Sequence, residues 1–331
     1  MGDHQKRIPF IDLAKGICIT LVVFYHSKGV LHCNYLTDSF LMSFRLPLYF
    51  FLSGLFFKDY GNFRTFFIKK TNRLLIPFFS FYLCFSVLIP NVMHYCLGMN
   101  FETVLGLPSL WAFIWPGEYP NIPIWFLLCL FLMNIYFWIV RKIVKESSIF
   151  LLIICIISGI IGYWLINHYE SDYGNLFKAL QSIPFFYFGY LFAHYEGLSV
   201  LQSLSKKRSI VCSFIFLIPT FILSVFIPWP TIITFYICGI SGTLFILLLA
   251  VLFQYLPLLS YIGRYSIIVL LTHGIFIRIL TPLYQYLNQS ISATSTIVVM
   301  TLLLLLSYYI IIPLMCRYFP YVTAQRPLIK E

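Results

Sequence analysis

The segment DLAKGICITLVVFYH places three ionisable side chains on one predicted helix, with Asp12 and Lys15 near its start and His26 at its end. Successive residues of an α-helix turn by about 100°, so Lys15 and His26 lie within about 20° of each other on one face and about 16 Å apart along the axis. Between them this face carries the apolar residues Ile19 and Val22. We interpret the stripe as the wall of an internal passage, with a cation at one mouth and an imidazole at the other.

His26 is the residue of this stripe that can take up or release a proton near neutral pH. Ionisable groups inside a membrane are costly and rare, which makes each one a candidate functional residue. For Asp12 and Lys15 a second interpretation stays open, because such a pair can also anchor a helix end at the headgroup level.

Two further segments carry cations that can complete such a site. In SFRLPLYFFLSG, Arg45 comes early in a helix that we expect to enter from outside, so it should lie level with His26. There it is a candidate functional residue, or it simply extends to the interface. In IKKTNRLLIPF, Lys70 and Arg73 are three positions apart on one predicted helix face, which suits the binding of phosphate groups.

The elements that position these residues belong to a membrane protein. The chain has 331 residues, of which 60% are hydrophobic, 20% aromatic and 10% charged, and its mean hydropathy is +0.89. A soluble core does not absorb that much apolar surface, so we expect an all-α polytopic integral membrane protein with one domain over 1–331. A spanning helix needs about 20 mostly apolar residues. About ten runs satisfy this: 8–28, 39–57, 73–95, 122–140, 149–166, 179–195, 209–227, 231–254, 264–286 and 293–316.

The basic residues predict the orientation of the chain. With the N-terminus inside, 17 of the 22 lysines and arginines fall in inner segments, whereas the outer loops hold only Lys28 and Lys178. This asymmetry predicts that both termini are cytoplasmic and that the number of spans is even. It also accounts for the net charge of +11, so we expect no nucleic-acid partner. The nine cysteines form no C-x-x-C pair, and we expect neither a disulfide framework nor a metal site.

Taken in order, these motifs resemble those of the membrane acyltransferase-3 family. Members begin with a helix of the type D-x-x-(R/K)-G-I, with ten residues between its basic position and a histidine. The resemblance covers most of the chain, and the predicted ten helices agree with it. The lysine in the first motif, and the lack of an added esterase-like domain, resemble the glycan O-acetylases, which include fucose acetylases and exopolysaccharide-modifying proteins. The matching positions are Asp12, Lys15, Gly16, Ile17 and His26; LPLYFFLSG at 46–54; Lys70 and Arg73; Trp125 and Phe126; and Gly263, Ser266 and His273.

The resemblance implies transfer of an acyl group, usually acetyl, from cytoplasmic acetyl-CoA to a sugar hydroxyl across the membrane. The implied partners are acyl-CoA, the lipid bilayer, and a surface polysaccharide or lipid-linked sugar, in the cytoplasmic membrane of a bacterium. No metal is implied. The pantetheine arm would thread past Ile19 and Val22 to bring its thioester to His26. There the neutral imidazole would remove the proton from the sugar hydroxyl as it attacks, or it would accept the acetyl group as a covalent acetyl-histidine, and both routes stay open. Arg45 would stabilise the oxyanion or orient the acceptor. The candidate residues are His26 and Arg45 for catalysis, Lys15, Lys70 and Arg73 for the donor, and Asp12, His273 and Glu118 in support.

Several alternatives stay open at this stage. His273 is either a second residue of the passage or a hydrogen-bonded packing residue. The outer loop around Glu118 carries Trp111, Trp115 and Tyr119, which suit sugar stacking but more often form an interfacial aromatic belt. The competing function is a flippase or exporter component for a glycan or lipid-linked sugar, without acyl transfer. A transporter is expected to show an internal repeat or paired broken helices, and the sequence shows neither.

Overall fold

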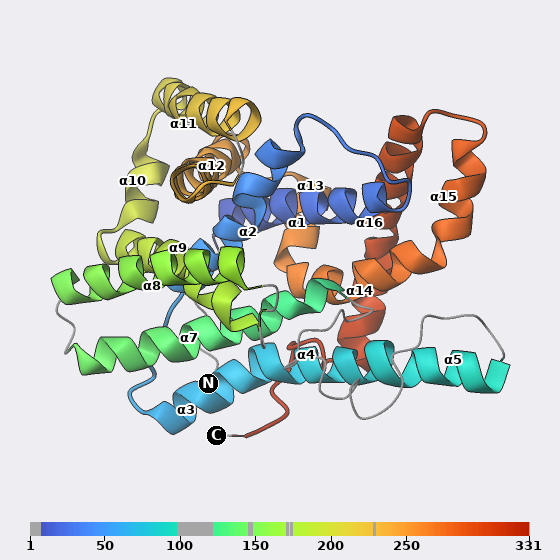
Figure 1. The fold of residues 1–331 in the computed structure, drawn as a ribbon, viewed down its shortest axis with the longest axis horizontal. Coiled ribbons are helices and arrows are strands. Elements are labelled where there is room, and N and C mark those ends of the chain that lie inside the picture. Colours follow the sequence, from blue (N-terminus) through green and yellow to red (C-terminus); the bar gives the residue numbers. More distant parts are fainter. Residues whose placement is uncertain are drawn as a thin grey trace.

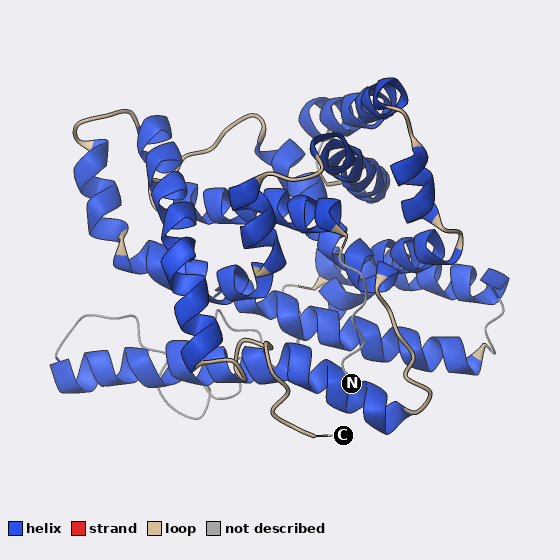
Figure 2. Ribbon diagram, turned by 180° about the vertical axis from the view of Figure 1, so that it is seen from behind, coloured by secondary structure: helices blue, strands red, loops and turns tan. Residues whose placement is uncertain are grey.

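The computed structural model describes residues 8–97, 122–144, 148–169, 172, 175–227 and 230–330. Every regular element in these ranges is helical, which confirms the predicted all-α class (Figures 1 and 2). Six of the helices are long and apolar enough to cross a bilayer. They are α1 (Pro9–Gly29), α7 (Trp125–Ile143), α8 (Ser148–His168), α11 (Lys206–Phe226), α12 (Ile232–Phe253) and α16 (Ala293–Tyr318).

A seventh candidate span is sharply bent. Helices α13 (Pro257–Arg264) and α14 (Ser266–Ile279) qualify only as a pair, and they meet at an angle of 94°. The sequence predicted one helix over 264–286, and this is wrong. After the bend at Tyr265, α14 ends at Ile279, and a new helix, α15 (Thr281–Asn288), begins after Leu280 with a proline as its second residue. Proline has no backbone N–H and is favoured in the first turn of a helix, so it marks this new start.

Two other predicted spans coincide with helices that are less apolar. These are α2 (Asp38–Leu55) and α9 (Leu176–His194), which is followed by the short α10 (Gly197–Ser203). Length and composition thus identify six or seven spans among the described residues, and the total of ten stays a prediction.

One long helical rod contains the predicted span 73–95, and it forms the lowest helix in Figure 1. Two of its stretches are π-helical, a wider coil that often occurs at functional sites. The first of them comes just before Pro77, which cannot donate a backbone hydrogen bond to the preceding turn. The rod consists of α3 (Phe63–Lys70), η1 (Thr71–Leu75), α4 (Ile76–Phe81), η2 (Tyr82–Leu88) and α5 (Ile89–Leu97), and a short 3₁₀ turn, η3 (Ile122–Ile124), precedes α7.

Helix α1 packs against α2, α12, α13, α14 and α16, and its closest neighbour is α13. Two glycines permit this approach. A Cβ atom on Gly16 would lie 1.9 Å from the carbonyl oxygen of Leu259, and one on Gly263 would lie 1.8 Å from that of Asp12. Both distances are far below any van der Waals contact, so only glycine fits at these two positions. The glycine of the D-x-x-K-G motif therefore fixes the N-terminal half of α1 directly against α13.

Helices α2 and α9 cross in the same way. A Cβ on Gly54 would lie 1.8 Å from the carbonyl oxygen of Phe186, and one on Gly189 would lie 1.9 Å from that of Phe51. The Ser-Gly at the end of the second motif thus allows α9 to lie against the backbone of α2. Because α2 also packs on α12 and α1, the helix that carries Arg45 is held from three sides.

Candidate functional site

Three helices bring a group of polar side chains together at the end of α1. His26, in the last turn of α1, faces His273 of α14, and their ring centroids are 5.2 Å apart with the planes inclined at 51°. Arg45 of α2 places its guanidinium carbon 3.9 Å from the centre of the Tyr25 ring. Tyr25 in turn meets His26 edge-on, at 5.5 Å between centroids. The structure therefore gathers His26, His273 and Arg45 in one cluster, with Tyr25 between the cation and the imidazole.

Two buried polar atoms of this cluster are available to a ligand. His273 is fully buried, and its Nδ1 donates to the carbonyl oxygen of Val269 at 2.8 Å. In a neutral ring this leaves Nε2 as an acceptor. That Nε2 atom and Nη1 of Arg45 have no hydrogen-bond partner among the described residues. Buried polar atoms are almost always paired, so two unpaired atoms beside His26 indicate a place where another molecule binds.

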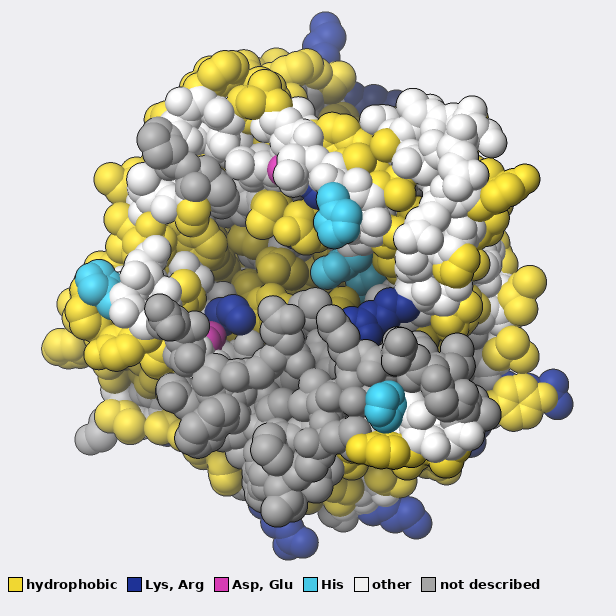
Figure 3. All heavy atoms as spheres, turned by 45° about the vertical axis from the view of Figure 1, so that its right-hand side comes forward, with side chains coloured by type: hydrophobic (Ala, Val, Ile, Leu, Met, Phe, Trp, Pro, Cys, Tyr) yellow, Lys and Arg dark blue, Asp and Glu magenta, His cyan; other side chains and the backbone are white. Residues whose placement is uncertain are grey.

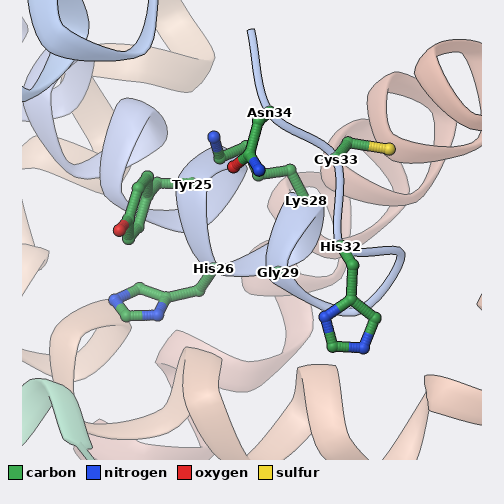
Figure 4. A pocket seen from close by; sticks show the side chains of 7 residues that line it. All are labelled: Tyr25, His26, Lys28, Gly29, His32, Cys33 and Asn34. Atoms are coloured by element: carbon green, nitrogen blue, oxygen red, sulfur yellow. The ribbon is translucent and has the colours of Figure 1, made fainter.

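A cavity of about 260 Å³ lies beside this cluster, slightly below the usual size of small-molecule sites, ~300 Å³ and above. In Figure 4, Tyr25 and His26 project together to one side of the helix end, and His32 projects to the other. His32 has a left-handed backbone, with φ of 51°, a conformation that costs energy and is enriched at functional sites. The cavity is lined by Tyr25, His26, Lys28, Gly29, His32, Cys33 and Asn34.

The charge of Lys28 in this cavity is compensated. Its ammonium group contacts the Asp38 carboxylate, which also accepts the backbone N–H of Tyr35 at 2.9 Å. In the space-filling view, histidine and basic side chains gather around a hollow in this face of the molecule (Figure 3). A ligand in the cavity therefore meets Lys28, whose charge Asp38 balances, together with phenol, imidazole and amide groups, a lining that suits a hydroxyl-rich molecule.

The predicted passage along α1 is closed. Lys15 and His26 are each half-buried, but Ile19 and Val22 between them are only 1% and 6% exposed and pack in the main hydrophobic cluster. The expectation that these two residues line an open passage is therefore wrong. The backbone carbonyl of Lys15 accepts a hydrogen bond from the Tyr49 hydroxyl at 2.8 Å, so α2 covers this part of α1.

The inner cations lie at the opposite end of α2. The Nζ atom of Lys15 is 5.6 Å from the ring centre of Phe56, and that of Lys70 is 5.8 Å from the ring centre of the next residue, Phe57. Consecutive aromatic rings thus hold two of the predicted donor-binding lysines at one rim. Asp12 is half-buried in the first turn of α1, next to α13. Glu118 lies outside the described residues.

Lys70 and Arg73 do not share a face as predicted. Lys70 is only 9% exposed and also lies over the Phe66 ring, whereas Arg73 is exposed. The reason is the π-helical stretch Thr71–Leu75, in which residues three apart do not stack as in an α-helix. Burial, and then the nearby charge of Arg73, lower the pKa of Lys70 to about 7. The two cations still interact, but only Arg73 faces water.

Several residues of the site escaped the sequence analysis. Tyr25 stands next to the predicted base, yet a tyrosine near a helix end reads first as an interfacial anchor. No motif in the sequence singles out His32 or Asn34, which lie between two predicted spans. For Asn72 there was one signal, a polar residue between two predicted phosphate-binding cations, and its partners lie more than 250 positions away in the sequence.

The chain matches the model of the acyltransferase-3 family, an acyltransferase domain, over residues 8–316. The match begins just before α1 and ends within α16, so it contains every described residue of the cluster and of the inner rim. Comparisons with curated proteins and with solved structures give no match.

Proposed function

The chain belongs to the acyltransferase-3 family and is a multi-pass membrane acyltransferase, and from this we propose its substrates and its site. We propose that it transfers an acetyl group from cytoplasmic acetyl-CoA to a hydroxyl group of a surface polysaccharide or lipid-linked sugar, in the cytoplasmic membrane of a bacterium. The supporting observation is the cavity beside His26, His273 and Arg45 at one end of α1, while Lys15 and Lys70 lie at the inner end of α2.

The reaction begins with the acceptor hydroxyl in the cavity next to His26. The imidazole takes the hydroxyl proton as the oxygen attacks the thioester carbonyl carbon. The carbonyl oxygen becomes an oxyanion, which the Arg45 guanidinium stabilises in a site largely closed to water. The carbon–sulfur bond then breaks, and the leaving thiolate receives the proton from the His26 imidazolium. The products are the O-acetylated sugar and free CoA.

His273 serves as the residue that orients the base. Its Nδ1–H is engaged by the Val269 carbonyl, so its Nε2 is left to accept an N–H group. An N–H donated by His26 to this atom would fix the His26 tautomer and turn its other nitrogen towards the cavity. A base held by a third group in this way is a recurrent arrangement in acyl transfer.

The inner rim receives the other end of the donor. The nucleotide end of CoA is polyanionic, and charge-assisted hydrogen bonds to phosphate are roughly twice as strong as neutral ones. Lys15 and Lys70 provide cations over the adjacent rings of Phe56 and Phe57, which directly follow α2, and the exposed Arg73 stands two residues beyond the start of η1. The acyl end must then cover about 16 Å, the axial distance from Lys15 to His26, which suits the extended pantetheine arm. Because Ile19 and Val22 close this route, the proposal requires that they move apart when the donor binds.

The proposal is tested with purified protein in lipid nanodiscs. Release of the CoA thiol from acetyl-CoA is followed with and without a panel of oligosaccharide acceptors, and O-acetyl signals of the surface glycan are compared in cells with and without the gene. We expect thiol release that depends on a sugar acceptor. Movement of a lipid-linked sugar across the bilayer with no thiol release would instead identify a flippase and overturn the proposal.

A further inference from the structure

The segment that follows α16 returns to the rod and binds to Asn72. The Oδ1 atom of Asn72 accepts the backbone N–H groups of Leu328 and Ile329, at 2.8 and 2.9 Å. Its Nδ2 donates to the carbonyl oxygen of Ile329 at 2.8 Å, and to that of Ile68 at 3.1 Å. Asn72 is only 6% exposed. One buried amide side chain thus satisfies three backbone groups at the far end of the chain.

This C-terminal tail, residues 319–330, is an ordered structure before it reaches Asn72. The backbone N–H groups of Gln325 and Arg326 both donate to the carbonyl oxygen of Pro320, at 2.8 and 3.0 Å. The Thr323 hydroxyl donates to the carbonyl oxygen of Phe319 at 2.8 Å. Figures 1 and 2 show the tail running down from α16 and passing along the rod near α3. Its end is therefore held at a defined place.

That place lies within the predicted donor motif. Asn72 stands between Lys70 and Arg73, and the tail carries two exposed cations, Arg326 and Lys330, on either side in sequence of the two residues that Asn72 holds. Among the described residues, the buried Oγ1 atom of Thr71, next to Asn72, has no hydrogen-bond partner. Several cations around an unpaired buried hydroxyl are the chemistry that recognises a phosphate-rich ligand.

The burial of Lys70 leaves a gap in the phosphate site that the tail can fill. Of the two motif cations only Arg73 is exposed, because Lys70 is covered by the Phe57 and Phe66 rings. Lys330 is the residue directly after Ile329, which Asn72 holds. It is exposed, so the tail brings a second exposed cation next to the residue that Asn72 binds.

We propose that the C-terminal tail forms one wall of the site for the nucleotide end of acyl-CoA. Lys330 binds a phosphate group of the nucleotide, and Asn72 is a positioning residue that holds the tail in place. This inference rests on the proposed function, since it requires acyl-CoA as the donor. The family match ends at residue 316, before the tail begins. The inference therefore assigns donor recognition to a segment outside that match.

The test compares two donors that carry the same thioester, acetyl-CoA and S-acetylpantetheine, which lacks the nucleotide. The full-length protein in nanodiscs is used, with the variants Lys330→Ala, Lys330→Arg and Asn72→Ala. Lys330→Ala should raise the KM for acetyl-CoA about threefold to tenfold, the effect of one partly exposed charge-assisted contact. The kcat/KM for S-acetylpantetheine should not change, and Lys330→Arg should restore the donor KM. Lys207→Ala, an exposed lysine at the start of α11, is the matched control and should behave as wild type.

Asn72→Ala removes the seat of the tail, so it should raise the acetyl-CoA KM at least as much as Lys330→Ala. If this variant does not fold, the exposed Lys330 variants still decide the matter. If Lys330→Ala leaves the KM for acetyl-CoA unchanged, the inference is overturned. The proposed function still stands in that case, provided that the wild-type protein turns over acetyl-CoA. Equal losses with both donors also overturn it, because they assign the tail a purely structural role. A wild-type protein that does not use acyl-CoA refutes the proposed function itself.

Discussion

The crossing of α1 and α13 offers a sharp test of the architecture, through the substitution Gly16→Ala. The new Cβ would lie 1.9 Å from the carbonyl oxygen of Leu259 and 2.6 Å from its carbonyl carbon, whereas ordinary contacts begin at 3.4 Å. The two backbones must therefore separate by the difference between 3.4 and 1.9 Å, which is 1.5 Å. Because the obstacle is backbone, no side-chain rotation can relieve it.

Such a separation affects both stability and catalysis. Overpacking in a closely packed core usually costs about 1–3 kcal/mol, and we expect the upper part of this range. The separation also moves α1, with His26, relative to the α13–α14 pair, with His273. A misplacement of about 1 Å in a catalytic arrangement can reduce the rate about 100-fold, so turnover should fall by that order.

The assay is thermal unfolding in detergent together with acetyl-transfer turnover per folded protein. Gly29→Ala is the matched control for stability, since it lies on the same helix and a Cβ there would meet nothing within 4 Å. The control should unfold at or slightly above the wild-type temperature, because alanine favours a helix by roughly 1 kcal/mol over glycine. If Gly16→Ala unfolds at the same temperature as Gly29→Ala, the close crossing of α1 and α13 is refuted.

Three other predictions concern the inner rim and the topology. Burial, then a neighbouring positive charge, lower the pKa of Lys70 to about 7, so its cation is lost as the pH rises from about 6 to about 8.5. The KM for acetyl-CoA should therefore rise over that range in wild type and stay level in Lys70→Arg. A wild-type KM that does not change with pH contradicts this prediction. Burial alone would raise the pKa of Asp59, but hydrogen bonds from the ammonium and indole groups of α7 outweigh it and lower that pKa below 3.8. The carboxylate thus stabilises the fold at neutral pH and loses this effect as the pH falls through its lowered pKa. Asp59→Asn should therefore reduce the unfolding temperature near pH 7, and by less and less as the pH falls below 3.8; reductions that do not change with pH refute this. In a cysteine-free background, a cysteine at Lys207 should be protected from membrane-impermeant thiol reagents in intact cells and one at Gln289 should be labelled; the reverse pattern excludes cytoplasmic termini.

Much of the fold follows from composition and periodicity, because a bilayer demands long apolar helices with few charges. The first helix, predicted over 8–28, is found at Pro9–Gly29. Arg45 comes early in the second helix and His26 late in the first, which predicts that the two side chains lie near each other. The structure confirms this, because Arg45 and His26 both contact Tyr25. These are local geometric consequences of helices whose ends are set by the membrane.

The features that the sequence did not reveal depend on local irregularity or on distant contacts. The π-helical stretch after Lys70 turns it away from Arg73, and no helical wheel drawn with a constant turn includes such a stretch. The 94° bend between α13 and α14 places His273 beside His26, and neither this bend nor the break at Leu280, inside the predicted span 264–286, shows in the apolar pattern. The tail is bound to Asn72 through its backbone N–H and carbonyl groups. Every residue type has such groups, so the sequence of the tail does not reveal this contact. In each case the information is tertiary.

The central claim is that His26 is the proton-accepting catalytic residue, and turnover of His26→Gln tests it most directly. Glutamine keeps hydrogen bonding and similar volume but has no basic nitrogen. The account predicts that His26→Gln and His26→Ala bind acetyl-CoA with wild-type affinity, since the donor-binding cations lie at the other end. It also predicts that both lose roughly 10²–10⁴-fold in turnover, the usual effect of removing a general base. A His26→Gln protein that keeps most of its activity would contradict the claim, and would leave His26 a packing residue beside a cavity whose base is elsewhere.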